Sequence, residues 1–235
     1  MAESVQQGLD DPLDHRIPEP ELMDEPARAR AYAVADFALV NQGFADRFRA
    51  TFADVAEGRV VDLGCGPADI PVRLARALPR IEILAIDAAR AMLHFACAAV
   101  NASGLDRRVR VITARVPALP FGDHRLDACI SNSLLHHLAD PLPFWREIRR
   151  IARPGAALLV MDLFRPPTRA AARAIVDASA AEESPILRLD FYNSLLAAFT
   201  VDEVRAQLGQ SGLEHCSCEI VSERHWLVAG RLHGG

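Results

Sequence analysis

Short apolar runs alternate with longer amphipathic stretches along most of the chain. Five runs are typical of buried β-strands and fall at residues 58–65, 81–87, 108–113, 126–133 and 156–164. Helical spacing of apolar positions marks residues 70–78, 89–104 and 142–153. Strands that alternate with helices predict a parallel sheet with helices on both of its faces.

This alternation breaks down near both ends of the chain. Apolar positions recur at steps of three and four in residues 26–52, which predicts one or two amphipathic helices. Residues 165–199 are also mostly helical in pattern and are expected to form a cap insertion. Thr200 and Glu203 match a capping box, and residues 216–223 and 224–232 predict an antiparallel hairpin at the sheet edge. We therefore expect an extended arm over residues 1–25 and one α/β domain over residues 26–235.

The composition narrows the choice of partners and location. The net charge of −5 argues against nucleic acid or an anionic membrane as partner, since both select basic surfaces. There is no apolar run of 18 residues and no basic, apolar leader at the start, so we expect no membrane span and a cytoplasmic location. The five scattered cysteines predict reduced thiols. Cys216 and Cys218 would supply half a metal site at most, so no metal is expected.

The stretch VVDLGCGPAD, residues 60–69, is the first candidate for chemistry. Gly64 and Gly66 would let a ligand approach the backbone at the end of the first strand. Asp87 ends the next strand, where an acid commonly accepts hydrogen bonds from ribose hydroxyls. Asp62 would repel a pyrophosphate but would suit a cationic ligand. The turn therefore favours a positively charged nucleoside over a dinucleotide.

Four segments resemble, in order, the motifs of class I S-adenosylmethionine-dependent methyltransferases. They read VVDLGCGPADIPVRLA, AIDAARAMLHFA, LPFGDHRLDACISNSLLHHLADP and REIRRIARPGAALLVMD. The resemblance covers roughly residues 58–165 and is nearest to the small-molecule branch that includes ubiquinone/menaquinone C-methyltransferases. It implies a Rossmann-like sheet of seven strands, mostly parallel, with an antiparallel C-terminal hairpin, helices on both faces and a helical cap. It also implies S-adenosylmethionine as cofactor, S-adenosylhomocysteine as product, and in-line methyl transfer to a small-molecule acceptor.

The resemblance also implies which residues hold the cofactor. The methionine part would meet Asp62, Gly64, Gly66, Asn132 and Ser133; the ribose would meet Asp87; the adenine would meet Ala88, Met92, Arg115 and Val116. The chain departs from the family pattern at two positions. Ala68 replaces a third glycine, which is expected to be tolerated because that glycine serves helix packing. Arg115 stands where an acid is typical, which puts the contact to the adenine edge in doubt.

His136 and His137 are the candidate catalytic bases, because imidazole titrates near neutral pH. The alternative is that they only pack and hydrogen-bond below the cofactor. Consecutive residues of a helix point about 100° apart, so we expect only one of them to face the reacting centre. His225 is expected to be structural.

The candidate substrate-binding residues lie in or next to the two cap segments, at Tyr32, Phe37, Arg165, Tyr192 and Asn193. An aromatic ring with a polar end suits a pocket wall. The alternatives are plain core packing for the tyrosines and a surface ion pair for Arg165.

The sequence leaves the acceptor and the methylated atom open among carbon, nitrogen, oxygen and sulfur. Two other functions keep the cofactor: an enzyme that modifies the cofactor itself, and a non-catalytic regulatory module. A nicotinamide-dependent dehydrogenase fits least, because Asp62 and the missing third glycine disfavour a pyrophosphate. A homodimer built on the cap helices remains an option.

Overall fold

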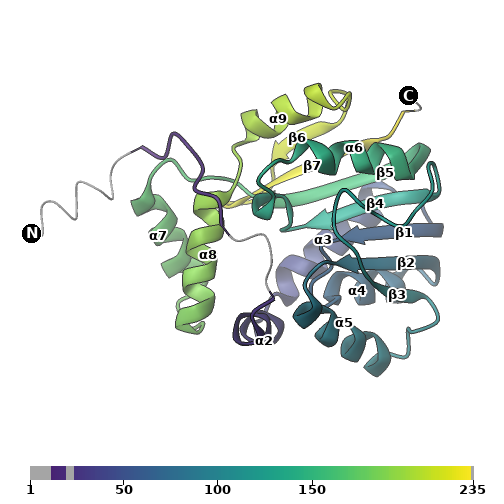
Figure 1. Cartoon of the computed structure of the whole chain (residues 1–235), viewed down its shortest axis with the longest axis horizontal. Coiled ribbons are helices and arrows are strands. Elements are labelled where there is room, and N and C mark those ends of the chain that lie inside the picture. Colours follow the sequence, from purple (N-terminus) through teal and green to yellow (C-terminus); the bar gives the residue numbers. More distant parts are fainter. Residues whose placement is uncertain (1–11, 20–23, 234–235) are drawn as a thin grey trace, which may run out of the picture.

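The computed structural model describes residues 12–19 and 24–233, and its centre is one seven-stranded sheet (Figure 1). The strands run in the order β3-β2-β1-β4-β5-β7-β6. Their bounds are β1 Glu57–Leu63, β2 Arg80–Asp87, β3 Val109–Thr113, β4 Leu126–Asn132, β5 Ala152–Leu163, β6 Ser217–Ile220 and β7 His225–Arg231. The pairs from β3 to β5 are parallel, and β7 is antiparallel to both β5 and β6. The expected fold class is confirmed.

Helices cover both faces of the sheet because the apolar side chains of each strand alternate between them. In β1, Val60 packs in the cluster with α3 (Ala38–Thr51), α4 (Asp69–Ala77) and α5 (Arg90–Ala102). Its neighbour Val61 packs in the opposite cluster with α6 (Leu142–Ile151) and α9 (Val201–Gln210). The capping box that starts α9 is present at Thr200 and Glu203, as expected. None of the helices within the described ranges has the length and apolar character that crossing a bilayer requires.

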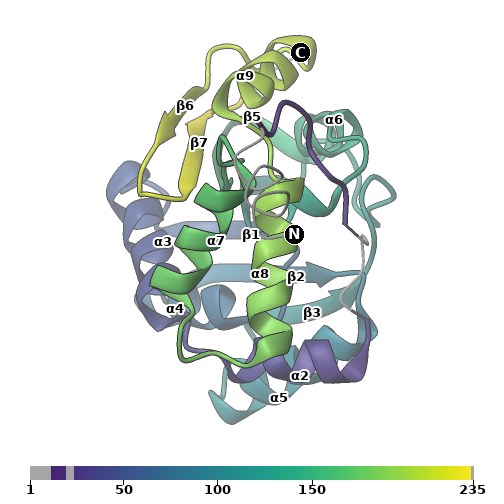
Figure 2. The same cartoon turned by 90° about the vertical axis from the view of Figure 1, so that its left-hand side faces the viewer.

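Three further helices lie beyond the carboxyl ends of the parallel strands (Figures 1 and 2). They are α2 (Pro26–Val34), α7 (Arg169–Ser179) and α8 (Pro185–Ala197). The hydroxyls of Thr168 and Ser184 cap α7 and α8, respectively. The carboxyl ends of β1, β2 and β4 therefore face this helical cap (Figures 1 and 2).

The described part of the N-terminal arm runs along this cap. The amide of Leu13 donates to the Pro167 carbonyl (2.8 Å), and the amide of Ile17 donates to the Leu196 carbonyl (2.9 Å). Residues 12–19 contain no helix. The rest of the expected arm, apart from residues 24–25, lies outside the described residues. The arm is therefore part of the cap rather than a separate tail over these eight positions.

Candidate active site

Two adjoining cavities lie between the strand ends and the cap. Both are lined by Tyr32, Phe37, Gly64, Gly66 and Asn132. One of them, the cap-side cavity, continues toward α8 and the turn that follows β4. All ten predicted cofactor-binding residues line one or both cavities. Their roles in binding remain predictions.

The structure explains the two glycines of the turn, Gly64 and Gly66, in different ways. The amides of Gly64 and Cys65 both donate to the Ile86 carbonyl at 2.8 Å, which fixes the turn against β2. Gly64 has φ +74°, and a Cβ there would lie 2.9 Å from the Cβ of Leu134. Gly66 has φ +51°, but a Cβ there would meet only Tyr32, at 3.8 Å. Gly64 is required by packing, whereas Gly66 leaves room on the cavity side.

Ala68 occupies a conformation that the sequence argument did not anticipate. It has φ +64° and ψ +28°, the left-handed region, and it forms the N-cap of α4 without a side-chain capping bond. Backbone in this region costs an alanine about 1–2 kcal/mol. A glycine here would therefore relieve backbone strain in addition to serving helix packing.

Asp87 is fixed by two backbone amides. Its Oδ2 accepts from Gly66 (2.9 Å) and its Oδ1 accepts from Ala89 (2.8 Å). Burial raises the pKa of Asp87, and these hydrogen bonds act against that rise. Each carboxylate oxygen keeps a further lone pair for a ligand hydroxyl. Asp87 lines the cavity together with Ala88 and Met92.

Asp62 and Asn132 present buried oxygens without hydrogen-bond partners in the described part of the chain. These are the Oδ1 atoms of the two side chains, at the ends of β1 and β4. Burial, together with the charge of Asp87, raises the pKa of Asp62 to about 8. Unpaired buried acceptors are costly, and a cationic or hydrogen-donating ligand would satisfy them. This pair fits the positively charged methionine part of the expected cofactor.

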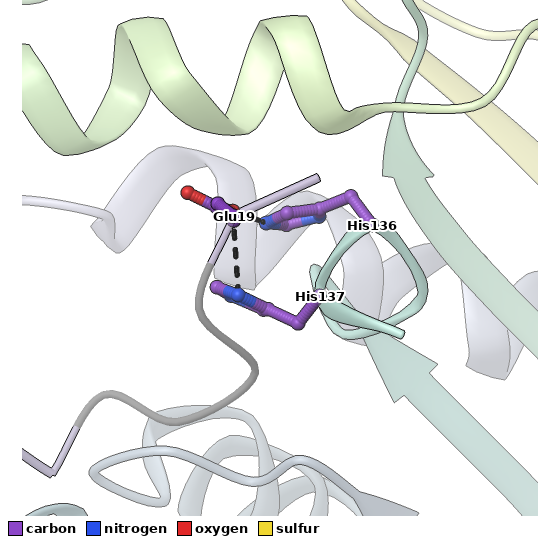
Figure 3. A group of neighbouring side chains, drawn as sticks. All are labelled: Glu19, His136 and His137. Atoms are coloured by element: carbon purple, nitrogen blue, oxygen red, sulfur yellow. Dashed lines mark ion pairs between the residues drawn. The ribbon is translucent and has the colours of Figure 1, made fainter. Parts of the chain in front are cut away.

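The two histidines both line the cap-side cavity. They belong to a short 3₁₀ turn, η1 (Leu135–His137), which directly follows β4 and Ser133. Their ring centroids are 4.2 Å apart, and both rings approach the Glu19 carboxylate of the arm (Figure 3). The expectation that only one of them would face the site is wrong. They lie in a three-residue turn rather than an α-helix, and their rings lie against each other with planes 36° apart.

His136 is held by a buried carboxylate that the sequence analysis missed. Its Nδ1 lies 2.5 Å from Oδ1 of Asp162, whose side chain is 1% exposed. Asp162 also accepts a hydrogen bond from the His136 amide. Burial alone would lower the pKa of His136, but the charge of Asp162 and its hydrogen bond raise it above the ordinary value. Burial would likewise raise the pKa of Asp162, and the His136 charge lowers it instead.

Only some of the predicted substrate-binding residues line the cap-side cavity. Tyr32 and Phe37 line it, with ring centroids 4.7 Å apart. On α8, the lining residues are Leu187, Asp190, Phe191 and Ser194, which recur at steps of three and four. Tyr192 and Asn193 are off this stripe, so the prediction that they face the substrate is wrong. Tyr192 instead packs against the apolar cluster under α7.

Arg165 does not point into the cavity either. It is 7% exposed and pairs with both oxygens of Glu203 (2.8 and 2.9 Å). It also donates to the carbonyls of Leu13 and Ala198. The ion-pair alternative was correct, although the pair lies under the arm.

His225 lines the cap-side cavity. Burial lowers its pKa to about 4, and its Nδ1 lies 2.8 Å from the Ser222 hydroxyl.

Sequence reasoning missed Glu19, Asp162, Asp190 and Ser194 as site residues. Asp162 carried a usable signal, because it lies near the carboxyl end of a strand, as Asp62 and Asp87 do. To predict Asp190 and Ser194, one would have had to know which face of α8 is turned toward the cavity. Glu19 lies in a proline-containing acidic stretch that carries no periodic signal.

Comparison with known proteins finds that this chain is similar to methyltransferases. The family model described as "Methyltransferase domain" matches residues 61–160. A 27-O-demethylrifamycin SV methyltransferase of Amycolatopsis mediterranei is 29% identical over 72% of this chain and 58% of its own length. A demethylmenaquinone methyltransferase of Thermus thermophilus is 34% identical over 49% of this chain and 51% of its own. This chain therefore spans little more than half the length of either curated relative.

A solved structure of similar fold comes from Methanococcus maripaludis and is described as a putative S-adenosyl-L-methionine-dependent methyltransferase. It is 18% identical, with a TM-score of 0.74 over 93% of this chain and 99% of that one. The likeness extends beyond the matched domain to the C-terminal strands and much of the cap. The motifs, the sheet order and these relatives agree that residues 61–160 are a methyltransferase domain similar to those of class I S-adenosylmethionine-dependent enzymes.

Proposed function

We propose that this protein transfers the methyl group of S-adenosylmethionine to a hydroxyl oxygen of a small, largely apolar acceptor. The observation that carries the proposal is the buried His136–Asp162 pair, which lies four residues beyond Asn132 along the chain and borders the same cavity. An imidazole whose Nδ1 hydrogen is held by a carboxylate presents Nε2 as a proton acceptor. Hydroxyl acceptors profit most from such a group, because their proton must leave.

The cofactor half of the cavity supplies binding and alignment. S-Adenosylmethionine, when bound, supplies an electrophilic methyl group on a positively charged sulfur. Asp62 and Asn132 would hold the methionine end with their unpaired oxygens, and Asp87 would accept from the ribose. Alignment of the two reactants and exclusion of water supply much of the rate acceleration in such a reaction.

The acceptor half of the cavity combines apolar walls with several polar and charged groups. Its aromatic and aliphatic surface comes from Phe37, Leu187 and Phe191. Its polar and charged groups come from the histidine turn, Ser194, Asp190, Glu183, Arg224 and His225. This arrangement suits an aromatic or polyketide-like molecule that carries a hydroxyl group. The name of the Amycolatopsis relative, whose substrate is an O-demethylated rifamycin, agrees with this class of acceptor.

The test is a labelled-methyl reaction with the full chain. The acceptors are a panel of phenols, hydroquinones and hydroxylated polyketides. We expect S-adenosylhomocysteine and a product that is 14 mass units heavier than its acceptor, because a methyl group replaces one hydrogen. Matched panel members in which the hydroxyl is replaced by hydrogen serve as controls and are expected to remain unmethylated. Methylation of the deoxy members at carbon would contradict oxygen as the target atom.

The two alternatives with the same cofactor are less well supported. A regulatory module would have no use for a buried imidazole–carboxylate pair bordering the cavity. An enzyme that alters the sulfonium group itself would need no apolar acceptor space under a cap. Cofactor turnover that does not depend on any added acceptor, with a mass change on the cofactor, would favour the second of these alternatives over methyl transfer.

A further inference from the structure

Three side chains that can bind a metal ion converge beside the acceptor half of the cavity (Figure 3). Glu19 comes from the arm, and His136 and His137 come from η1. Oε1 of Glu19 lies 3.4 Å from Nε2 of His136 and 3.3 Å from Nδ1 of His137. The candidate ligand atoms all lie within 4.8 Å of one another.

These separations fit shared coordination better than direct hydrogen bonding. Two ligands about 2.0–2.1 Å from a tetrahedral zinc ion are about 3.3–3.4 Å apart. A charge-assisted hydrogen bond between nitrogen and a carboxylate is shorter, at about 2.7–2.9 Å. On the other side of the same ring, Nδ1 of His136 lies 2.5 Å from Oδ1 of Asp162, which is the distance of a direct hydrogen bond. The Glu19 contacts are longer by nearly 1 Å.

The outer contacts also resemble those of a metal site. Metal-binding histidines usually donate their second ring N–H to a carboxylate, which fixes the ring and leaves the other nitrogen free to coordinate. Asp162 occupies that position behind His136. Ser194 donates to Oε1 of Glu19 (2.9 Å), which fixes the carboxylate and leaves a second lone pair on the same oxygen.

The charges around the cluster leave room for a dication. The charged groups that act on His136 are Asp162, Glu19 and Arg16. With both imidazoles neutral, these groups sum to one negative charge. Arg16 opposes a nearby cation, but its guanidinium is directed at the carbonyls of His136 (2.6 Å) and Leu138 (2.7 Å) rather than at Glu19.

We propose that Glu19, His136 and His137 bind a divalent transition-metal ion of the zinc class, with an open position toward the cavity. Imidazole and carboxylate together suit zinc and its neighbours, and three protein ligands with one open position are typical of catalytic sites. The binding site stands on this geometry alone, whereas its role rests on the proposed function. An acceptor hydroxyl bound to the ion loses its proton to water more readily, because the dication stabilises the resulting oxyanion.

Cobalt(II) binding to the full chain tests this proposal without any methyl transfer. The protein is treated with a chelator, desalted and titrated with Co²⁺, and the visible absorption bands of the ion are recorded. We expect one equivalent to bind, with the bands of a four- or five-coordinate site, and Zn²⁺ to displace it. Because neither cofactor nor acceptor is present, a failure here is distinguishable from a failure of the proposed function.

Variants locate the ion. Glu19→Gln and His137→Ala remove one ligand each and are expected to weaken Co²⁺ binding at least tenfold. Asp162→Asn, behind His136, is expected to weaken it about 10–100-fold. Glu183→Gln alters another acid that lines the cavity and is expected to bind as the unaltered chain does. Melting curves check that each variant folds, and Glu19 lies on the arm, so its variant leaves the sheet intact.

Two results would overturn the proposal. The first is a titration in which the unaltered chain gives no visible bands at equimolar cobalt. The second is Co²⁺ affinity that is unchanged in Glu19→Gln. Either result would leave His136 as an imidazole placed between two carboxylates, with protons rather than a metal ion at the cluster.

Discussion

The cofactor half and the acceptor half of the cavity are built in different ways. The proposed cofactor half is assembled from the ends of four adjacent parallel strands, β3, β2, β1 and β4, and the turns that follow them. The acceptor half draws on the arm, α2, the turn η1, α8 and the start of β7, which are spread over more than 200 positions of the chain.

The two halves also differ in what brings their residues together. Each cofactor residue is set by local backbone geometry, because the carboxyl ends of neighbouring parallel strands meet at one edge. The acceptor residues meet only after the cap has packed. Variants in the first half should therefore change cofactor affinity, and variants in the second half should change turnover or acceptor binding.

The largest effect should come from His136→Ala. Loss of the His136 imidazole, which either receives the acceptor proton itself or, with a metal ion bound, helps to hold that ion, should lower kcat about 10²–10⁴-fold. Cofactor affinity, measured by calorimetry, should stay the same, because His136 lies in the acceptor half. His94→Ala, on the exposed side of α5, is the control and should keep full turnover. A large loss of cofactor affinity in His136→Ala would break the division into halves.

Gly64→Ala should weaken cofactor binding by more than about tenfold, or 1.4 kcal/mol. Its Cβ would lie 2.9 Å from Leu134, so the turn must shift. Gly104→Ala is a matched control, because Gly104 also has a positive φ (+65°) but open space around it. Both variants carry the backbone strain, and only Gly64→Ala carries the clash. Equal cofactor affinities would show that the turn tolerates the shift.

Cofactor affinity should rise about tenfold from pH 6 to pH 7. With a pKa of about 8, Asp62 is mainly protonated in the free protein, and a cationic ligand favours its ionised form. Binding therefore releases a proton below about pH 8, and affinity increases with pH until Asp62 is ionised without the ligand. Calorimetry in buffers of different ionisation enthalpy measures the released proton. Asp62→Asn should abolish the pH dependence, and a slope that persists in this variant would assign it to another group.

Arg16→Ala should raise KM for the acceptor by roughly tenfold, since one hydrogen bond to a charged group contributes about 1.5 kcal/mol. Arg16 donates to the carbonyls of His136, Leu138 and Ala197, and so fixes the arm to the acceptor half. Steady-state kinetics with saturating cofactor gives the value. Arg188→Ala removes an exposed ion pair of α8 and should leave KM unchanged. An unchanged KM in Arg16→Ala would show that the arm does not shape acceptor binding.

Ala68→Gly should stabilise the protein by between about 0 and 1.6 kcal/mol. It relieves about 1–2 kcal/mol of left-handed strain, of which about 0.4–1 kcal/mol is offset by the greater freedom of glycine in the unfolded chain. Ala98→Gly, in the exposed interior of α5, should instead destabilise by about 0.5–1 kcal/mol. Urea unfolding compares the two variants. Destabilisation by Ala68→Gly would mean that the Ala68 methyl packing outweighs the strain.

The sequence predicted the sheet, and it predicted residues at the strand ends that line the cavities, because both depend on local patterns. Alternating apolar positions determined which face each strand residue packs on, and glycines and acids at strand ends marked the turn. The acceptor half depended on the phase of α8 and on a three-residue turn, neither of which periodicity specifies. Tyr192 was therefore predicted to face the cavity, although it lies one position off the lining face of α8. Arg165 was predicted to bind a ligand, although its N–H groups donate to Glu203 and to a carbonyl of the arm.

The Arg16 side chain has a consequence for how the cap moves. One guanidinium joins the backbone of the histidine turn to the residue that ends α8, and it stacks 3.9 Å from the Phe199 ring. The turn and the helix end therefore cannot separate independently while the arm is seated. An acceptor too large for the closed cavity would enter only when the arm, the histidine turn and the end of α8 separate together. The arm would therefore hold the cavity closed until it dissociates.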